Sequence, residues 1–131
     1  MSALKITILG CGSSFGVPLF HNIWGKCDPK EPKNIRSRPS ILVQKNGKNL
    51  LIDTSPDLKQ QILSNKIDNI DAVFYTHEHA DHTHGINELR SINLIHRKII
   101  PCYGNEQTME KITNSFNYLF ENTEKSYYPA I

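Results

Sequence analysis

Short runs of alternating or continuous apolar residues recur along the chain and predict five β-strands. β-Branched and aromatic residues are frequent in these runs, as expected where side chains pack on a pleated sheet. Two of the runs flank Asn46-Gly47, a pair that favours a two-residue hairpin turn. Pro101 lies inside the last run and places it at a sheet edge or at a bulge. The predicted strands span residues 4–9, 40–44, 49–53, 71–76 and 98–103.

Apolar residues that repeat every three or four positions predict three helices between and after these strands. The first is a short amphipathic helix at residues 58–63, which Asp57 is placed to cap. The second spans residues 85–96, directly after a polar segment. Asn105 is placed to cap the third helix, which continues to Leu119.

Two segments without a regular repeat carry residues that could bind ligands. Segment 10–18 holds three glycines and two serines, which a plain turn explains as well as an anion-binding loop does. The long irregular segment 19–39 carries His21 and Cys27, each too isolated to predict a metal site. Arg38 could pair with a phosphate, although arginines that are exposed or paired with a structural carboxylate are commoner.

Composition excludes several classes of protein. The 131 residues are enough for a single domain with its own core, and no linker or repeat divides residues 1–131. A net charge of +2 is too small to predict nucleic-acid binding. No apolar run approaches the ~20 residues that cross a bilayer, and the first residues lack the apolar core of a signal peptide. Three widely spaced cysteines suit a reducing compartment, so we expect a cytoplasmic protein.

Residues 76–85 concentrate the side chains that could carry chemistry. They include four of the six histidines, with an aspartate between the second and the third. His77 and His79 are two residues apart, so an extended backbone directs both imidazoles to the same side. Imidazole nitrogens and a carboxylate oxygen suit zinc and related divalent metals. The alternative is a solvated loop rich in histidine, but the density of ligands directly after an apolar strand favours the metal site.

The pattern His-x-His-x-Asp-His resembles the metal-binding motif of the metallo-β-lactamase-fold hydrolases. The resemblance implies that His77 and His79 bind one metal ion and that Asp81 and His82 bind a second. It implies zinc, or else manganese, as the cofactor, with up to two ions in a completed site. Asp81 would also hold the attacking water and is the predicted catalytic residue. His84 lies outside the pattern and would support a ligand or contact the substrate.

Three further motifs narrow the resemblance to the phosphodiesterase branch of this superfamily. With the histidine motif they look like the PhnP-like phosphoribosyl cyclic phosphodiesterases and, more distantly, ribonuclease Z. The resemblance implies that a metal-bound hydroxide hydrolyses a small phosphodiester, such as a cyclic phosphate or a nucleotide-like substrate. It makes Arg38 a substrate-binding candidate. It also implies that Asp53 supports the ligating histidines, whereas its position alone would equally suit a helix cap. The three motifs are residues 10–18, 36–40 and 53–57.

The resemblance covers only the N-terminal half of the family's αββα sandwich. The predicted fold class is therefore α+β, with a mixed, mostly antiparallel sheet and helices on one face. In the family, later histidines and an aspartate complete both metal sites, but this chain has no aspartate after Asp81 and only His96 after His84. Each ion would have two ligands here, where catalytic zinc normally takes three. Cys27 stands alone where PhnP-like enzymes have a cysteine cluster for a structural zinc.

These gaps leave two main hypotheses about function. The chain is a phosphodiesterase-type hydrolase completed by a C-terminal half or by a second copy of itself, or it is a truncated, inactive remnant with a weak metal site. A hydrolase of thioesters or lactams is a third hypothesis, which the phosphate-branch motifs disfavour. Half of a sandwich would also leave the apolar face of strands 40–44 and 49–52 without a cover, and such a patch marks an interaction surface.

Overall fold

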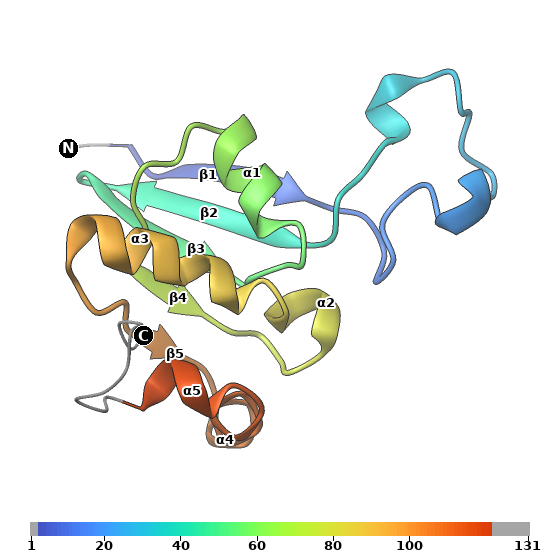
Figure 1. The fold of residues 1–131 in the computed structure, drawn as a ribbon. Helices are drawn as coiled ribbons and strands as arrows, with labels where there is room; N and C mark the ends of the chain where they lie inside the picture. The colour runs from blue at the N-terminus through green and yellow to red at the C-terminus, as the bar shows by residue number, and fades with distance from the viewer. Residues whose placement is uncertain (1–2, 122–131) are drawn as a thin grey trace.

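The computed structural model describes residues 3–121 as a five-stranded sheet with helices packed against one face (Figure 1). The strands lie in the sheet in chain order. The first three are antiparallel to one another, and the last two continue the sheet in parallel. The predicted α+β class, with a mixed sheet and helices on one face, is confirmed. The strands are β1 (Lys5–Gly10), β2 (Ser40–Lys45), β3 (Lys48–Ile52), β4 (Ala72–Phe74) and β5 (Cys102–Tyr103).

Helices connect the parallel strands, because parallel neighbours need a long crossover. Further helices follow the last strand. One helix lies between β3 and β4, two lie between β4 and β5, and two follow β5. No helix among the described residues is long and apolar enough to cross a membrane. The helices are α1 (Leu58–Ser64), α2 (Ala80–Thr83), α3 (Leu89–His96), α4 (Glu106–Ser115) and α5 (Asn117–Phe120), with 3₁₀ turns η1 (Phe20–Asn22), η2 (Pro32–Asn34) and η3 (Ile86–Glu88).

The hairpin predicted at Asn46-Gly47 joins β2 to β3. Both residues have a positive φ, 52° and 72°, as a two-residue turn of type I′ requires. Lys45 pairs with Lys48 across the turn, and the pairing continues without a shift to Ile41 and Ile52. Because side chains alternate along a strand, this register decides which residues face the helices.

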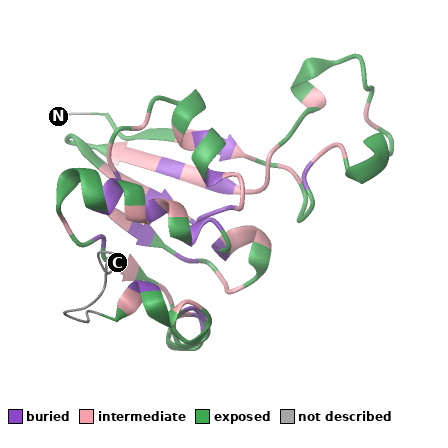
Figure 2. Ribbon diagram, in the orientation of Figure 1, coloured by how far each residue is buried: buried purple, intermediate pink, exposed green. Residues whose placement is uncertain are grey.

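One face of the sheet forms the core with the helices. Leu42, Leu51 and Val73 lie side by side on three neighbouring strands and are at most 2% exposed. They belong to one hydrophobic cluster with Leu58 of α1 and Leu89 of α3. In Figure 2, buried residues are concentrated on the strands of the sheet, whereas the helices packed on it carry many exposed residues.

The opposite face of the sheet is apolar and, within residues 3–121, has no covering layer. A single row crosses all five strands and consists of Ile8, Ile41, Ile52, Phe74 and Tyr103. Ile8 of β1 is 64% exposed, and Phe74 of β4 is 43% exposed. The prediction of an uncovered face is therefore confirmed, and the face extends to the outer strands. We call this row the bare face.

Some element boundaries differ from those predicted. β5 comprises only the last two residues of the predicted run, because Pro101 has no N–H to donate to a ladder. The third helix is broken at Phe116, whose φ of −126° and ψ of 37° are not helical. The predicted cap of this helix is confirmed, since the side chain of Asn105 accepts a hydrogen bond from the Thr108 N–H at 2.8 Å.

Candidate metal site

Residues 76–85, the histidine segment, follow β4 and include α2. His77 and His79 lie in the stretch before the helix, and Asp81 and His82 lie in its first turn. His79 has φ −61° and ψ 151°, so the chain changes from extended to helical at this residue. The N–H of His82 donates to the carbonyl oxygen of His79 at 3.0 Å. This turn brings the third imidazole back toward the first two.

Three imidazoles and one carboxylate gather at this point. The ring centroids of His77 and His79 are 4.7 Å apart, and those of His77 and His82 are 4.0 Å apart. Oδ2 of Asp81 lies 3.2 Å from Nε2 of His82. The four predicted ligand residues are therefore close together, as a shared metal site requires.

The gathered side chains do not form a complete ligand cage. In the part of the chain that the structure describes, no group of three or more His, Cys, Asp and Glu side chains is arranged to hold one metal ion. The donor types nevertheless are those that zinc prefers, nitrogen from imidazole and oxygen from a carboxylate. Among the described residues, suitable donor types therefore lie close together without forming a three-ligand site.

Asp53 is hydrogen-bonded to Nδ1 of His82, the ring nitrogen that does not face Asp81. Asp53 is 4% exposed, and its Oδ2 lies 2.7 Å from Nδ1 of His82. Its other oxygen accepts a hydrogen bond from the Thr76 N–H at 2.8 Å. With Nδ1–H donating a hydrogen bond to this carboxylate, the lone pair of the His82 ring is on Nε2, the nitrogen that faces Asp81. The backbone of Asp53 has φ 61°, a left-handed conformation that an aspartate tolerates better than most residues.

Thr76 links this carboxylate to the first histidine, a role that sequence reasoning missed. Its hydroxyl donates to Oδ2 of Asp53 at 2.6 Å and lies 3.0 Å from Nδ1 of His77. Because its proton is given to the carboxylate, the hydroxyl accepts from Nδ1 of His77 and leaves Nε2 of that ring free. The only signal in the sequence is the place of the threonine, directly before the first histidine.

A buried polar network fixes the loop after β3 to the end of α2. The N–H of Thr54 donates to the His82 carbonyl oxygen at 2.8 Å, and the Thr54 carbonyl accepts from the Gly85 N–H at 2.9 Å. The hydroxyls of Thr54 and Tyr75 are 2.9 Å apart, and burial raises the pKa of Tyr75 well above its usual value. A Cβ at position 85 would lie 1.8 Å from the carbonyl oxygen of Ser55, so only glycine fits there.

Arg38 makes a bidentate ion pair with Asp57. Nη2 and Nε of Arg38 lie 2.7 and 2.9 Å from the two oxygens of Asp57, and the Arg38 N–H also donates to the carboxylate. These hydrogen bonds lower the pKa of Asp57 and raise that of Arg38. The side chain of Asp57 therefore binds Arg38 and, contrary to the prediction, forms no capping hydrogen bond with α1.

The glycines of segment 10–18 allow two backbones to approach closely. A Cβ at Gly10 would lie 2.2 Å from the Arg38 carbonyl oxygen, and one at Gly12 would lie 2.7 Å from that of Arg36. The N–H of Gly12 donates to the Ser37 carbonyl oxygen at 2.7 Å. The sequence offered a plain turn or an anion-binding loop for this segment, whereas the structure shows that Gly10 and Gly12 are needed for close backbone packing, and that the amide of Gly12 is already bonded.

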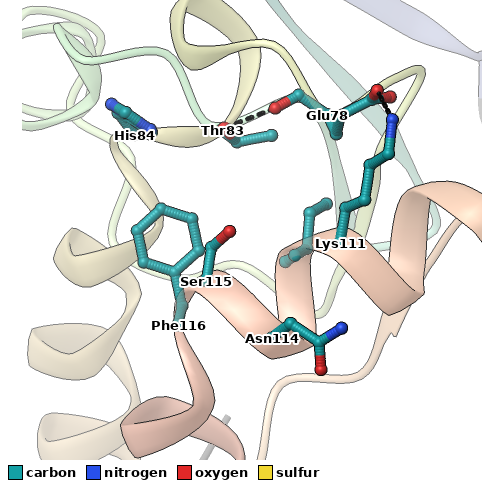
Figure 3. A pocket seen from close by; sticks show the side chains of 8 residues that line it. Glu78, Thr83, His84, Lys111, Asn114, Ser115 and Phe116 are labelled. Atoms are coloured by element: carbon teal, nitrogen blue, oxygen red, sulfur yellow. Dashed lines mark hydrogen bonds and ion pairs between the residues drawn. The ribbon is translucent and has the colours of Figure 1, made fainter.

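His84 lies against the C-terminal helices. Its ring packs edge-on against Phe116, with centroids 5.6 Å apart. Figure 3 shows both rings at one end of a pocket of about 270 Å³, with the ion pair of Glu78 and Lys111 at the other. The hydrogen bond from Lys111 lowers the pKa of Glu78. The structure thus gives His84 a packing partner on another helix, which the sequence pattern did not predict.

The metal site opens onto the bare face. A groove of about 380 Å³ is lined by His82, Asp53 and Thr76 together with side chains of the bare face that include Ile8 and Ile52. The groove thus connects the bare face with the ring of His82.

A family model for the β-lactamase superfamily domain matches residues 48–130. The chain belongs to the metallo-β-lactamase superfamily. The match includes β3, residues 76–85 and the helices α1 to α5 of the described part of the chain, so it covers most of what builds the site.

The chain is also similar to longer curated and solved proteins of the superfamily and beyond. It is 37% identical over 128 residues to an octanoyltransferase of Porphyromonas gingivalis, covering 97% of this chain and 25% of that protein. It is 34% identical over 76 residues to ribonuclease Z of Methanopyrus kandleri, covering 56% of this chain and 27% of that protein. In structure it matches a diphosphatase of the PhnP family with a TM-score of 0.78 and 38% identity, covering 89% of this chain and 47% of that one. The chain thus spans about a quarter of these curated relatives and less than half of the diphosphatase.

Proposed function

We propose that this chain is the metal-binding half of a phosphodiester hydrolase. The observation that carries the proposal is the buried carboxylate of Asp53, which holds Nδ1 of His82 and leaves Nε2 facing Asp81. Such carboxylate–histidine pairs orient the ligands of metal sites and raise their basicity. The four phosphodiesterase motifs and the name of ribonuclease Z support a phosphodiester as the bond that is cleaved, and the name of the diphosphatase supports phosphate chemistry in general.

Zinc fits the donor set, with manganese as the second candidate. His77 and His79 would hold one ion, and Asp81 and His82 a second. When bound, such ions supply an activated water at neutral pH and neutralise charge on the phosphate. The chain's own side chains would do the positioning. Asp53 and Thr76 fix the rings of His82 and His77 through hydrogen bonds. Asp81 would orient the attacking water.

Completion of the site requires a second structural layer on the bare face. The groove lined by both His82 and Ile8 supports this proposal, because a layer on the bare face would lie next to the His82 ring. A complementing C-terminal half would bury the exposed row and supply those ligands in one step. The length of the diphosphatase favours this partner over a second copy of the chain, because the chain covers only 47% of it.

The alternative is an inactive remnant that keeps the fold and a weak metal site. The incomplete ligand set favours it, because catalytic zinc normally has three protein ligands. The octanoyltransferase name adds no further candidate, since the match spans only a quarter of that protein.

For localisation we propose the cytoplasm, because Cys11, Cys27 and Cys102 are all free thiols.

Zinc binding by the chain tests the assignment of ligands. We expect His79→Gln to weaken zinc binding at least tenfold in isothermal titration calorimetry, because it removes an inner ligand. His96→Gln is the matched control, since the His96 ring contacts the carbonyl oxygen of Asp68 outside the site. Equal zinc affinity of the two variants would refute the assignment.

Hydrolysis of bis(p-nitrophenyl) phosphate tests the activity and the need for a second half. The zinc- or manganese-loaded chain is assayed alone and with the C-terminal half of the PhnP-family diphosphatase added in trans. We expect turnover only in the mixture. Turnover by the chain alone would overturn both the remnant and the need for completion. No turnover by a complex that forms and binds zinc would instead support the remnant.

A further inference from the structure

An apolar groove lies in the excursion between β1 and β2, which projects from the sheet (Figure 1). Phe20 is 92% exposed and Phe15 is 78% exposed, an unusual arrangement for two aromatic side chains. The groove has a volume of about 520 Å³, within the range of small-molecule sites. It is lined by Phe15, Pro18, Leu19, Phe20, His21, Ile23 and Arg38.

Backbone bridges hold the groove in shape. Val17 pairs with Arg36 across the base of the excursion, with hydrogen bonds of 2.9 and 3.0 Å in both directions. Leu19 pairs with Ile23 around a tight turn. The exposed apolar side chains are therefore carried on a fixed frame, which lowers the entropic cost of binding a ligand between them.

The groove adjoins the candidate metal site through Arg38. This side chain lines the groove, and its backbone N–H and guanidinium both bond Asp57, which holds it in place. The next two residues of the chain, Pro39 and Ser40, line the second groove together with His82 and Asp53, so Arg38 lies between the two grooves along the chain. His21 and Arg38 are the titratable side chains of the lining, and neither is acidic.

We propose that this groove binds the apolar ester group of the phosphodiester substrate, with its phosphate directed past Arg38 toward the imidazoles. The inference rests on the proposed function and adds the substrate class, a phosphodiester that carries an aromatic or other large apolar substituent. Two N–H donors of the guanidinium, those on Nε and Nη2, are held by Asp57, and its remaining N–H groups can donate to a phosphate. The two phenylalanines offer ring faces for stacking. A phosphodiester with small alkyl groups would leave the groove empty.

Binding to the metal-free chain separates this inference from the catalytic proposal. Trp24 is the only tryptophan and follows Ile23, so its indole N–H gives a single NMR signal beside the groove. In the presence of EDTA, we expect bis(p-nitrophenyl) phosphate to shift this signal and to bind at least about tenfold more tightly than dimethyl phosphate. Binding that shows no preference for the aryl ester would overturn the inference, whatever the metal-loaded protein hydrolyses.

Two phenylalanine variants locate the aryl group. Phe20→Ala removes a groove side chain, and we expect it to weaken bis(p-nitrophenyl) phosphate about five- to tenfold without unfolding the chain, since Phe20 packs on little. Phe74→Ala is the matched control, because it removes an exposed ring from the bare face. Weakening by Phe74→Ala alone would place the ligand on the bare face and overturn the inference. A concentration-dependent shift of the indole signal without ligand would instead assign the groove to contact with a second copy and overturn it as well.

Discussion

The two faces of the sheet carry the same kind of side chain in opposite surroundings. Leu51 on one face is fully buried beneath the helices, whereas its neighbour Leu50 on the other face is only half-buried. Ile8 and Phe74 on the bare face remain in large part exposed. A strand with apolar side chains on both faces is typical of a sheet that is covered on both faces. The described residues provide a covering layer on one face.

The candidate metal site lies at the boundary between these faces. From the covered side, Asp53 and the network under α2 fix the rings of the site. Toward the bare side, the same residues open into the groove that leads to Ile8. The chain alone fixes the orientation of the His82 ring. Under the proposed function, a second layer would add the missing metal ligands.

The largest effect is expected from a change on the covered side, where backbones touch. Gly85→Ala would place a Cβ 1.8 Å from the carbonyl oxygen of Ser55, a contact that neither backbone can avoid. We expect a loss of about 4–5 kcal/mol or more in the free energy of unfolding, measured by urea denaturation. Gly104→Ala is the control, because its Cβ would meet the flexible end of Met109 at 3.1 Å. Equal stability of the two variants would contradict the packing described at Gly85.

A pair of adjacent leucines tests the two faces directly. Leu51→Ala should lower the free energy of unfolding by about 2–4 kcal/mol, because it leaves a cavity in a closed core. Leu50→Ala should cost about 1 kcal/mol or less, because its side chain loses only partial burial. Thermal and urea denaturation of both variants give the comparison. If the two losses are equal, the bare face is covered in solution.

Much of this fold could be predicted from local patterns. The apolar runs located the strands, and Asn46-Gly47 fixed the hairpin and hence the register of β2 and β3. The short β5 and the break at Phe116 were missed, because ladder bonds and helix ends depend on neighbours that a periodicity does not contain. The bare face was predictable from the resemblance to half of a sandwich.

The candidate site divides in the same way. Residues close together in the sequence, such as His77 and His79, also lie close together in the structure, so their clustering was foreseeable. The partners of Arg38 and the ring against His84 come from segments 19 and 32 residues away, and only the packing of the chain selects them. Local sequence thus predicts which groups gather, while tertiary structure decides which of them are already engaged.

Asp53 offers a smaller, more specific test at the boundary of the two faces. Asp53→Asn keeps the side-chain shape, and asparagine tolerates the left-handed backbone. Its amide can donate to Nδ1 of His82, which would move the ring proton to Nε2 and block that nitrogen as a ligand. We expect zinc affinity to fall about 10–100-fold and the imidazole ¹⁵N shifts to show the other tautomer. The exposed Asp68→Asn is the control, and an unchanged tautomer would contradict the role of Asp53.

The smallest change in stability is expected on the bare face itself. Ile8→Thr keeps a β-branched side chain at a position that is 64% exposed, so the free energy of unfolding should change by about 0.5 kcal/mol or less. The matched change on the covered face is Val73→Thr, which buries a hydroxyl and should cost about 1–3 kcal/mol. Ile8→Thr should nevertheless reduce the binding of a hydrophobic dye and of the C-terminal half of the diphosphatase, because both need apolar area on this face. A variant that loses stability but binds the added half as before would show that Ile8 packs within the chain, and that the second layer docks elsewhere.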